Sequence, residues 1–198
     1  MRNEKIKDFV FSSIIVSIIV VLTATMWGFI PLGGFAYITI IHIPVLIGAI
    51  ILGKKYGLIF GTVFGISSLV LSLILLGGNA PFTNPLLSVV PRAFFGFIIY
   101  PLYALFSRQI KSHPLAISVT IVVSTLLHSI IVGAGLYFIG KAGFYFTASE
   151  NPWTTNDNFF VFFLSLFSLN SLIEIVLAVL IGTPTVMVLE KLRNNAQD

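Results

Sequence analysis

Residues 37–68 read YITIIHIPVLIGAIILGKKYGLIFGTVFGISS, and the interpretation of the whole chain begins from them. The stretch holds two apolar runs that are separated by the charged pair Lys54-Lys55. His42 and Pro44 interrupt the first run close to its start. An apolar run this short and broken by proline is typical of a substrate region in membrane transporters. The stretch therefore predicts a membrane hairpin whose first arm has a partly polar purpose.

The second run carries a glycine at every fourth position, at Gly57, Gly61 and Gly65. Residues four apart lie on one face of a helix, so these glycines leave that face without side chains. In lipid, a face of small residues lets another helix approach closely. The second arm is therefore predicted to be a helix built for packing.

The composition places the chain in a membrane. Its 198 residues are 57% hydrophobic and only 9% charged, with a mean hydropathy of +1.04. A soluble domain carries roughly 25% charged residues. We therefore expect an integral protein of the lipid bilayer, with residues 1–198 forming a single domain and no separate soluble catalytic domain. The absence of cysteine excludes disulfides and thiolate metal sites.

Six apolar segments predict the fold class, an all-α bundle of six transmembrane helices. The strict alternation expected of a membrane β-barrel is absent, and a helix bundle satisfies every backbone group in lipid. The segments are residues 9–30, 38–52, 56–76, 85–106, 115–139 and 159–189.

Basic residues predict the orientation of the bundle. With a cytoplasmic N-terminus, nine of the 11 Lys and Arg residues fall on the cytoplasmic side, as the positive-inside rule requires. Both termini are then cytoplasmic in a multi-pass protein of the cell membrane. Because these cations sit in short clusters at membrane boundaries, no nucleic-acid partner is expected. The nine residues are Arg2, Lys5, Lys7, Lys54, Lys55, Arg108, Lys111, Lys191 and Arg193.

Ionisable residues inside the segments predict a site. Arg92, Glu174, His42 and His128 lie at membrane depth, and Asn170 shares a helix face with Glu174. Such residues are costly in lipid, so a functional role is the default hypothesis. Their shared depth in the outer half of the bundle predicts a pocket that opens outward.

Each of these residues also has a structural interpretation. Arg92 would snorkel to outer headgroups, and Glu174 would pair with Arg92 or His128. His42 would cap backbone near Pro44, and His128 would bond a neighbouring serine.

Sequence motifs for several enzyme classes are missing. The chain has no G-x-x-x-x-G-K-[ST] loop, no H-E-x-x-H and no G-x-S-x-G. Three histidines, with His113 expected in a cytoplasmic loop, cannot form a three-histidine metal site within the bilayer. We therefore expect neither catalytic residues nor a metal or other cofactor.

Several motifs carry a resemblance to a known family. Thr39-x-x-His-Ile-Pro-Val-x-Ile-Gly-Ala49, then Leu52-Gly53-x-x-Tyr56-Gly57, and Pro91-Arg-x-x-x-Gly96 resemble the substrate-binding (S) components of energy-coupling-factor (ECF) vitamin transporters. The residues of the first motif are most similar to those of pantothenate-type members, and folate-type members are also similar. The resemblance covers the whole chain.

The resemblance implies a partner and a docking face. It implies a protein that binds one vitamin from outside and then associates with a membrane coupling subunit and two ATPase subunits. In the family the first helix often docks through Ala-x-x-x-Ala, and here Ser13 and Ser17 stand at the matching positions. Gly61 is expected to belong to the same docking face.

The resemblance also implies the site residues. Pantothenate offers a carboxylate for Arg92, and its hydroxyl and amide groups would bond polar side chains. We predict His128, Asn170, Glu174, Asn84 and His42 as those polar partners, and Tyr37, Phe82 and Trp153 as the apolar walls.

Three alternatives remain open. Folate or another vitamin would be the substrate, an intramembrane enzyme would use Glu174 and His128 as acid and base, or the chain would be a structural membrane protein without a ligand.

Overall fold

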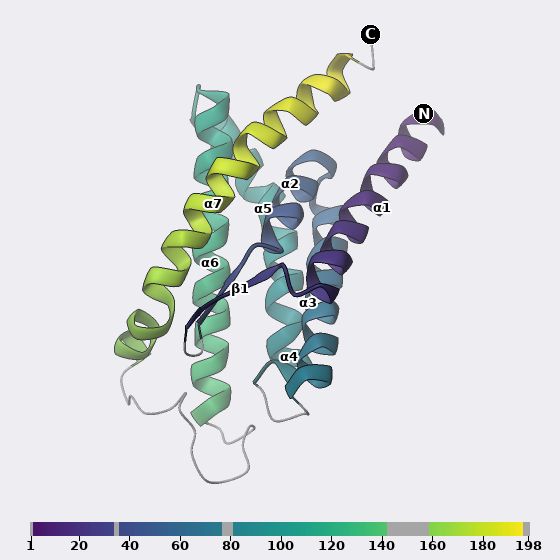
Figure 1. Ribbon diagram of the computed structural model, residues 1–198. Helices are drawn as coiled ribbons and strands as arrows, with labels where there is room; N and C mark the ends of the chain where they lie inside the picture. Colours follow the sequence, from purple (N-terminus) through teal and green to yellow (C-terminus); the bar gives the residue numbers. More distant parts are fainter. Residues whose placement is uncertain (1, 34–35, 77–80, 142–158, 196–198) are drawn as a thin grey trace.

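Helices dominate the computed structural model, which describes residues 2–33, 36–76, 81–141 and 159–195 (Figure 1). One antiparallel strand pair, β1 (Phe29–Gly33) with β2 (Ala36–Thr39), follows the first helix, and a 3₁₀ turn, η1 (Pro81–Thr83), precedes the fourth. The helices are α1 (Arg2–Ala24), α2 (His42–Leu52), α3 (Lys54–Leu76), α4 (Pro85–Ser88), α5 (Val90–Gln109), α6 (His113–Lys141) and α7 (Phe159–Asn195).

Membrane-length helices account for most of the predicted segments. Within the described residues, five stretches are long and apolar enough to cross a bilayer, and this agrees with the predicted class of helical membrane protein. They are Lys5–Ala24, Lys54–Ile74, Pro85–Gln109, His113–Phe138 and Asn170–Asn195.

The second predicted segment is not one long helix. Its first residues belong to β2, and the helical part is α2, with 11 residues. At 1.5 Å per residue α2 is about 16 Å long, whereas the hydrocarbon core is about 30 Å thick. The helix begins at His42, with Pro44 in its first turn. Proline is tolerated there because backbone N–H groups of the first turn have no partner within the helix.

The first predicted segment, residues 9–30, also ends earlier as a helix than expected. Helix α1 ends at Ala24, and the chain then turns through Met26, whose φ of 59° is left-handed. Gly28 is buried at this turn, where a Cβ would overlap the side chain of Ile41. The chain then enters β1, which pairs Phe29 with Thr39. Hydropathy alone did not separate this apolar strand from the helix before it.

Helix α2 forms the centre of the core. Its residues from His42 to Ile50 are all buried, and it contacts α1, α3, α5 and α7. A helix that is apolar on every side is stable only when other elements surround it. The short arm of the opening hairpin is therefore the element around which the longer helices pack.

The glycines of α3 face α5 of the same chain. A Cβ at Gly61 would overlap the carbonyl oxygen of Arg92, and a Cβ at Gly57 would overlap that of Gly96. The predicted close approach of a helix to this face is therefore confirmed. The assignment of Gly61 to a partner-docking face is corrected, because α5 already covers it.

Both chain ends lie at one end of the bundle (Figure 1). The start of α1 and the end of α7 are together there, and the turn between α5 and α6 lies at the same end. Helix α7 has 37 residues, about 55 Å, so it exceeds the thickness of the hydrocarbon core.

Candidate functional site

Four ionisable side chains are buried in one layer of the bundle, each from a different helix. Arg92 comes from α5, His42 from α2, His128 from α6 and Glu174 from α7. Their exposed fractions are 6%, 1%, 9% and 5%. Charged residues are rarely this buried unless they are paired. The contacts of each side chain therefore indicate whether its role is structural or whether it could bind a ligand.

Arg92 is held by a carbonyl and two aromatic rings. Its Nη1 donates to the carbonyl oxygen of Leu87 at 2.6 Å. The guanidinium carbon lies 4.7 Å from the centre of the Phe82 ring and 5.7 Å from that of Phe64. These contacts place Arg92 inside the protein, which is inconsistent with snorkelling to headgroups. Phe82 thus lies beside Arg92, and its role as a wall of the site stays a prediction.

Glu174 contacts the strand pair rather than the arginine. Its Oε1 accepts the backbone N–H of Thr39 at 2.6 Å. Arg92 and Glu174 interact only at longer range, and in the described part of the chain neither Arg92 nor His128 forms an ion pair with Glu174. The direct pairing considered from sequence is therefore absent from this part of the structure.

The two histidines surround Phe95. The His128 ring centre is 4.7 Å from that of Phe95 and 6.1 Å from that of Phe64. The His42 ring meets Phe95 edge-on at 6.4 Å, and its Nε2 is buried without a hydrogen-bond partner. The expectation that His42 bonds nearby backbone stays a prediction.

Within the described residues, seven buried polar side-chain atoms lack a hydrogen-bond partner. Most buried polar atoms in proteins are hydrogen-bonded, so a group of exceptions needs an explanation. The simplest is a polar ligand that these atoms would contact. They are Nε2 of His42, Nε of Arg92, Oγ of Ser124, Oγ1 of Thr125, Nδ1 of His128, Oδ1 of Asn170 and Oγ of Ser171.

Sequence reasoning missed Ser124, Thr125 and Ser171. Ser124 precedes His128 by four positions on α6, and Ser171 precedes Glu174 by three on α7. Residues at these spacings share a helix face. Helical periodicity therefore was the signal that would have found these hydroxyl groups.

Among the predicted site residues, Asn84 has a different contact, and two others fall outside the described residues. The side chain of Asn84 accepts the backbone N–H of Leu86 at 2.9 Å and so caps α4. This contact gives Asn84 a capping role, and its substrate contact stays a prediction. The side chain of Tyr37 and all of Trp153 lie outside the described residues.

A family profile decides the classification of the chain. The profile of the ECF transporter substrate-specific component matches residues 7–186. The chain belongs to this family. It is therefore a transporter component, and its apolar helices are those of a membrane protein.

Two curated relatives of this S component are named as pantothenate transporters. The pantothenic acid transporter PanT of Lactococcus lactis subsp. cremoris is 25% identical over 217 residues, covering 99% of this chain and 100% of the relative. The pantothenate transporter PanT of Leuconostoc mesenteroides is 27% identical over 189 residues, covering 91% of each chain. Both relatives are thus similar to the S component over nearly their full length.

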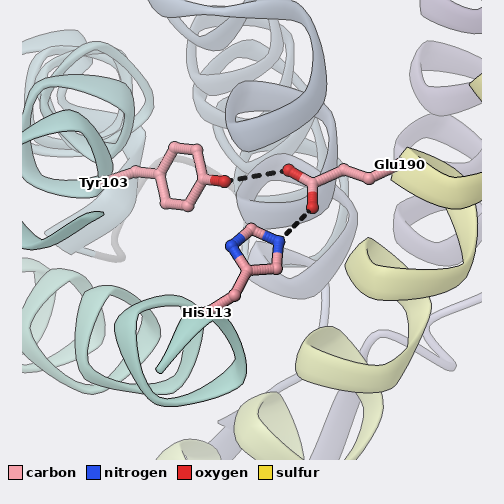
Figure 2. Close-up of polar contacts among 3 residues, drawn as sticks. All are labelled: Tyr103, His113 and Glu190. Carbon is pink, nitrogen blue, oxygen red and sulfur yellow. Dashed lines mark hydrogen bonds and ion pairs between the residues drawn. The ribbon is translucent and has the colours of Figure 1, made fainter. Parts of the chain in front are cut away.

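A second polar cluster in the S component lies at the end that holds both termini. Figure 2 shows Tyr103 of α5 and His113 of α6 converging on the carboxyl group of Glu190 from α7. The hydroxyl of Tyr103 donates to Oε1 at 2.9 Å, and Nε2 of His113 lies 2.6 Å from Oε2. His113 was expected in a loop, but it is the first residue of α6.

Arg193 connects this cluster to the last turn of the central helix α2. Its Nη1 donates to the carbonyl oxygen of Ile51 at the end of α2, and its Nη2 lies 3.0 Å from Asp8 of α1. A cavity of about 340 Å³ adjoins it, lined by Ile51, His113, Glu190, Arg193 and Asn194. Here charged groups bond to one another, whereas those of the Arg92 layer leave atoms without partners. We therefore take the Arg92 layer as the candidate site.

Proposed function

We propose that this chain is the high-affinity vitamin-binding S component of an ECF-type ABC importer in the cell membrane, with pantothenate as substrate. The observation that carries this proposal is the set of unpartnered polar atoms around Arg92. The two relatives named for pantothenate support the choice of vitamin.

The chemistry of the layer suits this ligand. Arg92 has an unpartnered Nε and a fork of donors, which match the two oxygens of a carboxylate. His128 and Asn170, with the hydroxyl groups of Ser124 and Ser171, would bond the hydroxyl and amide groups of pantothenate. Phe82, Phe64 and Phe95 offer apolar surface for its branched carbon core, and Tyr37 and Trp153 stay in the proposal as further walls.

The position of the layer supports binding from the extracellular side. Arg92 lies in the first turn of α5, whereas Tyr103, near the other end of α5, belongs to the cluster beside the chain termini. The basic residues near the termini favour a cytoplasmic location for that end. The polar layer then lies in the outer half of a six-span bundle in which β2 and α2 together form the second crossing.

Transport requires partners in this proposal. The chain contains no phosphate-binding loop, so a membrane coupling subunit and two ATPase subunits would supply the energy. Ser13 and Ser17 are exposed on α1, where small side chains would allow the coupling subunit to pack closely.

Calorimetric titration of the purified protein tests the substrate. We expect saturable, high-affinity binding of pantothenate and no binding of folate under the same conditions. Native mass spectrometry of the protein as isolated should detect the mass of pantothenate. Retention of folate or another vitamin in place of pantothenate would move the chain to another substrate class within the family, and binding of no vitamin would contradict the proposal.

A further inference from the structure

We propose that Pro91 is a positioning residue for substrate recognition. It leaves the carbonyl oxygen of Leu87 without a helical donor, and this oxygen then fixes the Arg92 guanidinium so that its Nε edge is presented to the carboxylate of the substrate. The inference rests on the proposed function and deepens it, because Pro91 would act on the substrate through Arg92.

The junction between α4 and α5 contains an acceptor that the helix cannot use. Helix α4 ends at Ser88, α5 begins at Val90, and Val89 between them has right-handed helical angles. In a helix, the carbonyl of one residue accepts the N–H of the residue four positions later. Four positions after Leu87 stands Pro91, and proline has no N–H. The Leu87 carbonyl therefore needs a partner from elsewhere.

Arg92 is that partner. Its Nη1 donates to the Leu87 carbonyl oxygen at 2.6 Å, a short bond of the kind that a charged donor makes. Leu87 is 1% exposed and Arg92 is 6% exposed, so both groups are largely removed from solvent. The residue that follows the proline thus supplies the donor that the proline lacks.

The acceptor is held rigidly because the junction rests on α3. The hydroxyl of Ser88 donates to the carbonyl oxygen of Gly65 at 3.2 Å. A Cβ at Gly65 would lie only 2.7 Å from Cα of Val89, so the two backbones are in direct contact. The position of the neighbouring Leu87 carbonyl is therefore determined by packing between α3 and the α4–α5 junction.

The contacts of the guanidinium leave one edge for a ligand. Leu87 bonds Nη1, and the Phe82 ring lies 4.7 Å from the guanidinium carbon. Nε has no partner, and its N–H is parallel to one N–H of Nη2, so these two atoms form a fork that matches a carboxylate. Because the fork is fixed before the ligand arrives, binding requires less ordering of this long side chain.

The test measures the carboxylate preference of the full-length protein. This preference is the affinity for pantothenate divided by that for its alcohol analogue, in which CH₂OH replaces the carboxylate, both from calorimetry. The wild type should prefer pantothenate by roughly 30-fold or more. Pro91→Ala adds an N–H that competes with Arg92 for the Leu87 carbonyl, so the preference should fall by roughly twofold to tenfold.

An ester variant separates the N–H from the other effects of removing proline. Lactic acid at position 91, introduced by nonsense suppression, has the methyl group of alanine but an oxygen atom in place of its N–H. Pro91→lactic acid should keep the wild-type preference. Equal preferences in Pro91→Ala and Pro91→lactic acid would show that the N–H is not the cause and would overturn the inference.

Thermal melting checks that each variant folds. Pro91→Ser supplies the same N–H as Pro91→Ala and should show the same fall, so it replaces Pro91→Ala if that variant does not fold. Failure of both to fold, with Pro91→lactic acid folded, would contradict the inference, because the N–H is expected to release a side chain and not to break the helix.

Arg92 is required for the effect. Arg92→Ala should bring the preference near one, and adding Pro91→Ala to that variant should not change it further. If Pro91 has a merely structural role, Pro91→Ala will weaken the binding of both ligands equally and leave the preference unchanged, which would contradict the inference.

Pro101→Ala is the matched control. Pro101 lies inside the same helix, about two and a half turns from Arg92, and leaves the carbonyl of Phe97 without its helical donor. Pro101→Ala should keep the wild-type preference. If the wild type binds no pantothenate, the proposed function fails. If the wild type shows the preference and folded Pro91→Ala keeps it, only this inference fails.

Discussion

Arg92 shows what a single residue needs at membrane depth. Its neighbours are a carbonyl oxygen and two aromatic faces, and the nearest carboxyl group in the layer is bound elsewhere. Ring faces attract a cation, by about 2 kcal/mol or more where water is excluded. They do not neutralise its charge, so an anionic ligand would gain strongly from binding there.

Replacing Arg92 should affect binding more than stability. Arg92→Ala should weaken pantothenate binding by about 2–5 kcal/mol, the cost of removing one side of a buried charge pair, or roughly 30-fold to several thousand-fold. Arg92→Lys should recover part of this loss, because an ammonium group lacks the planar fork. Calorimetric titration of both variants against the wild type measures the change.

Thermal melting of the empty proteins provides the control. Because Arg92 bonds Leu87 rather than Glu174, Arg92→Ala should cost about 1–3 kcal/mol of stability, the range for an unmatched buried hydrogen-bonding group. Unchanged affinity in Arg92→Ala would remove this residue from the site.

At the scale of elements, the contact between α3 and α5 positions the site. Gly57 and Gly61 let the backbone of α5 approach, and this approach places the first turn of α5, with Arg92, beside Phe64. Any side chain on this face would therefore move Arg92 as well as weaken the packing.

Gly61→Ala should destabilise the protein by about 1–3 kcal/mol or more, because the added methyl group meets the backbone of Arg92, which cannot rotate away. Gly182→Ala is the matched control, since its methyl group would meet only the flexible end of Ile121 at 2.9 Å. Melting should rank Gly61→Ala well below Gly182→Ala. Equal melting of the two would show that α3 and α5 are not in backbone contact.

Helix α1 presents the opposite case, a face that the chain itself leaves uncovered. Ser13 and Ser17 are exposed, and their hydroxyl groups bond the carbonyl oxygens of Phe9 and Ser13 on the same helix. The pair would therefore offer a small and internally satisfied surface to the proposed coupling subunit.

Leucine at Ser13 or Ser17 should hold the coupling subunit away without disturbing the distant Arg92 layer. We expect normal pantothenate affinity and lost uptake by the complete transporter. Uptake in reconstituted vesicles, with calorimetry alongside, measures both quantities. If transport survives both Ser13→Leu and Ser17→Leu, the docking face lies elsewhere.

At the scale of the whole molecule, both termini lie at one end of the bundle, and the basic residues there predict which side of the membrane that end faces (Figure 1). Lys55, at the start of α3, and Lys111, between α5 and α6, are exposed at that end, and the basic residues around them favour the cytoplasm. The chain has no native cysteine, so single cysteines can be introduced without further changes.

Cysteines placed singly at Lys55, Lys111, Asn79 and Asn151 test this orientation in intact cells. An impermeant thiol reagent should label the last two and leave the first two unlabelled until the membrane is opened. External labelling at Lys55 would reverse the predicted topology.

The sequence by itself determined the class of the molecule and the residues of interest. Composition and the length of apolar runs require membrane helices, because these properties are sums over neighbouring residues. The glycine spacing of α3 predicted a close helix contact, and the burial of Arg92, His42, His128 and Glu174 followed from their depth in apolar segments. Each of these conclusions depends on local pattern alone.

Only the tertiary structure decided which groups meet. Glu174 bonds Thr39 across 135 positions of sequence, although its opposite charge would favour Arg92 as the partner. Apolar residues after Ala24 pair as strands because their hydrogen-bonding partners lie in residues 36–39, and hydropathy does not distinguish strand from helix there. Gly61 faces α5 rather than a partner protein, and its spacing alone could not show which helix would pack against it. A pattern shows that a face is small, apolar or polar, whereas packing in three dimensions determines what lies against it.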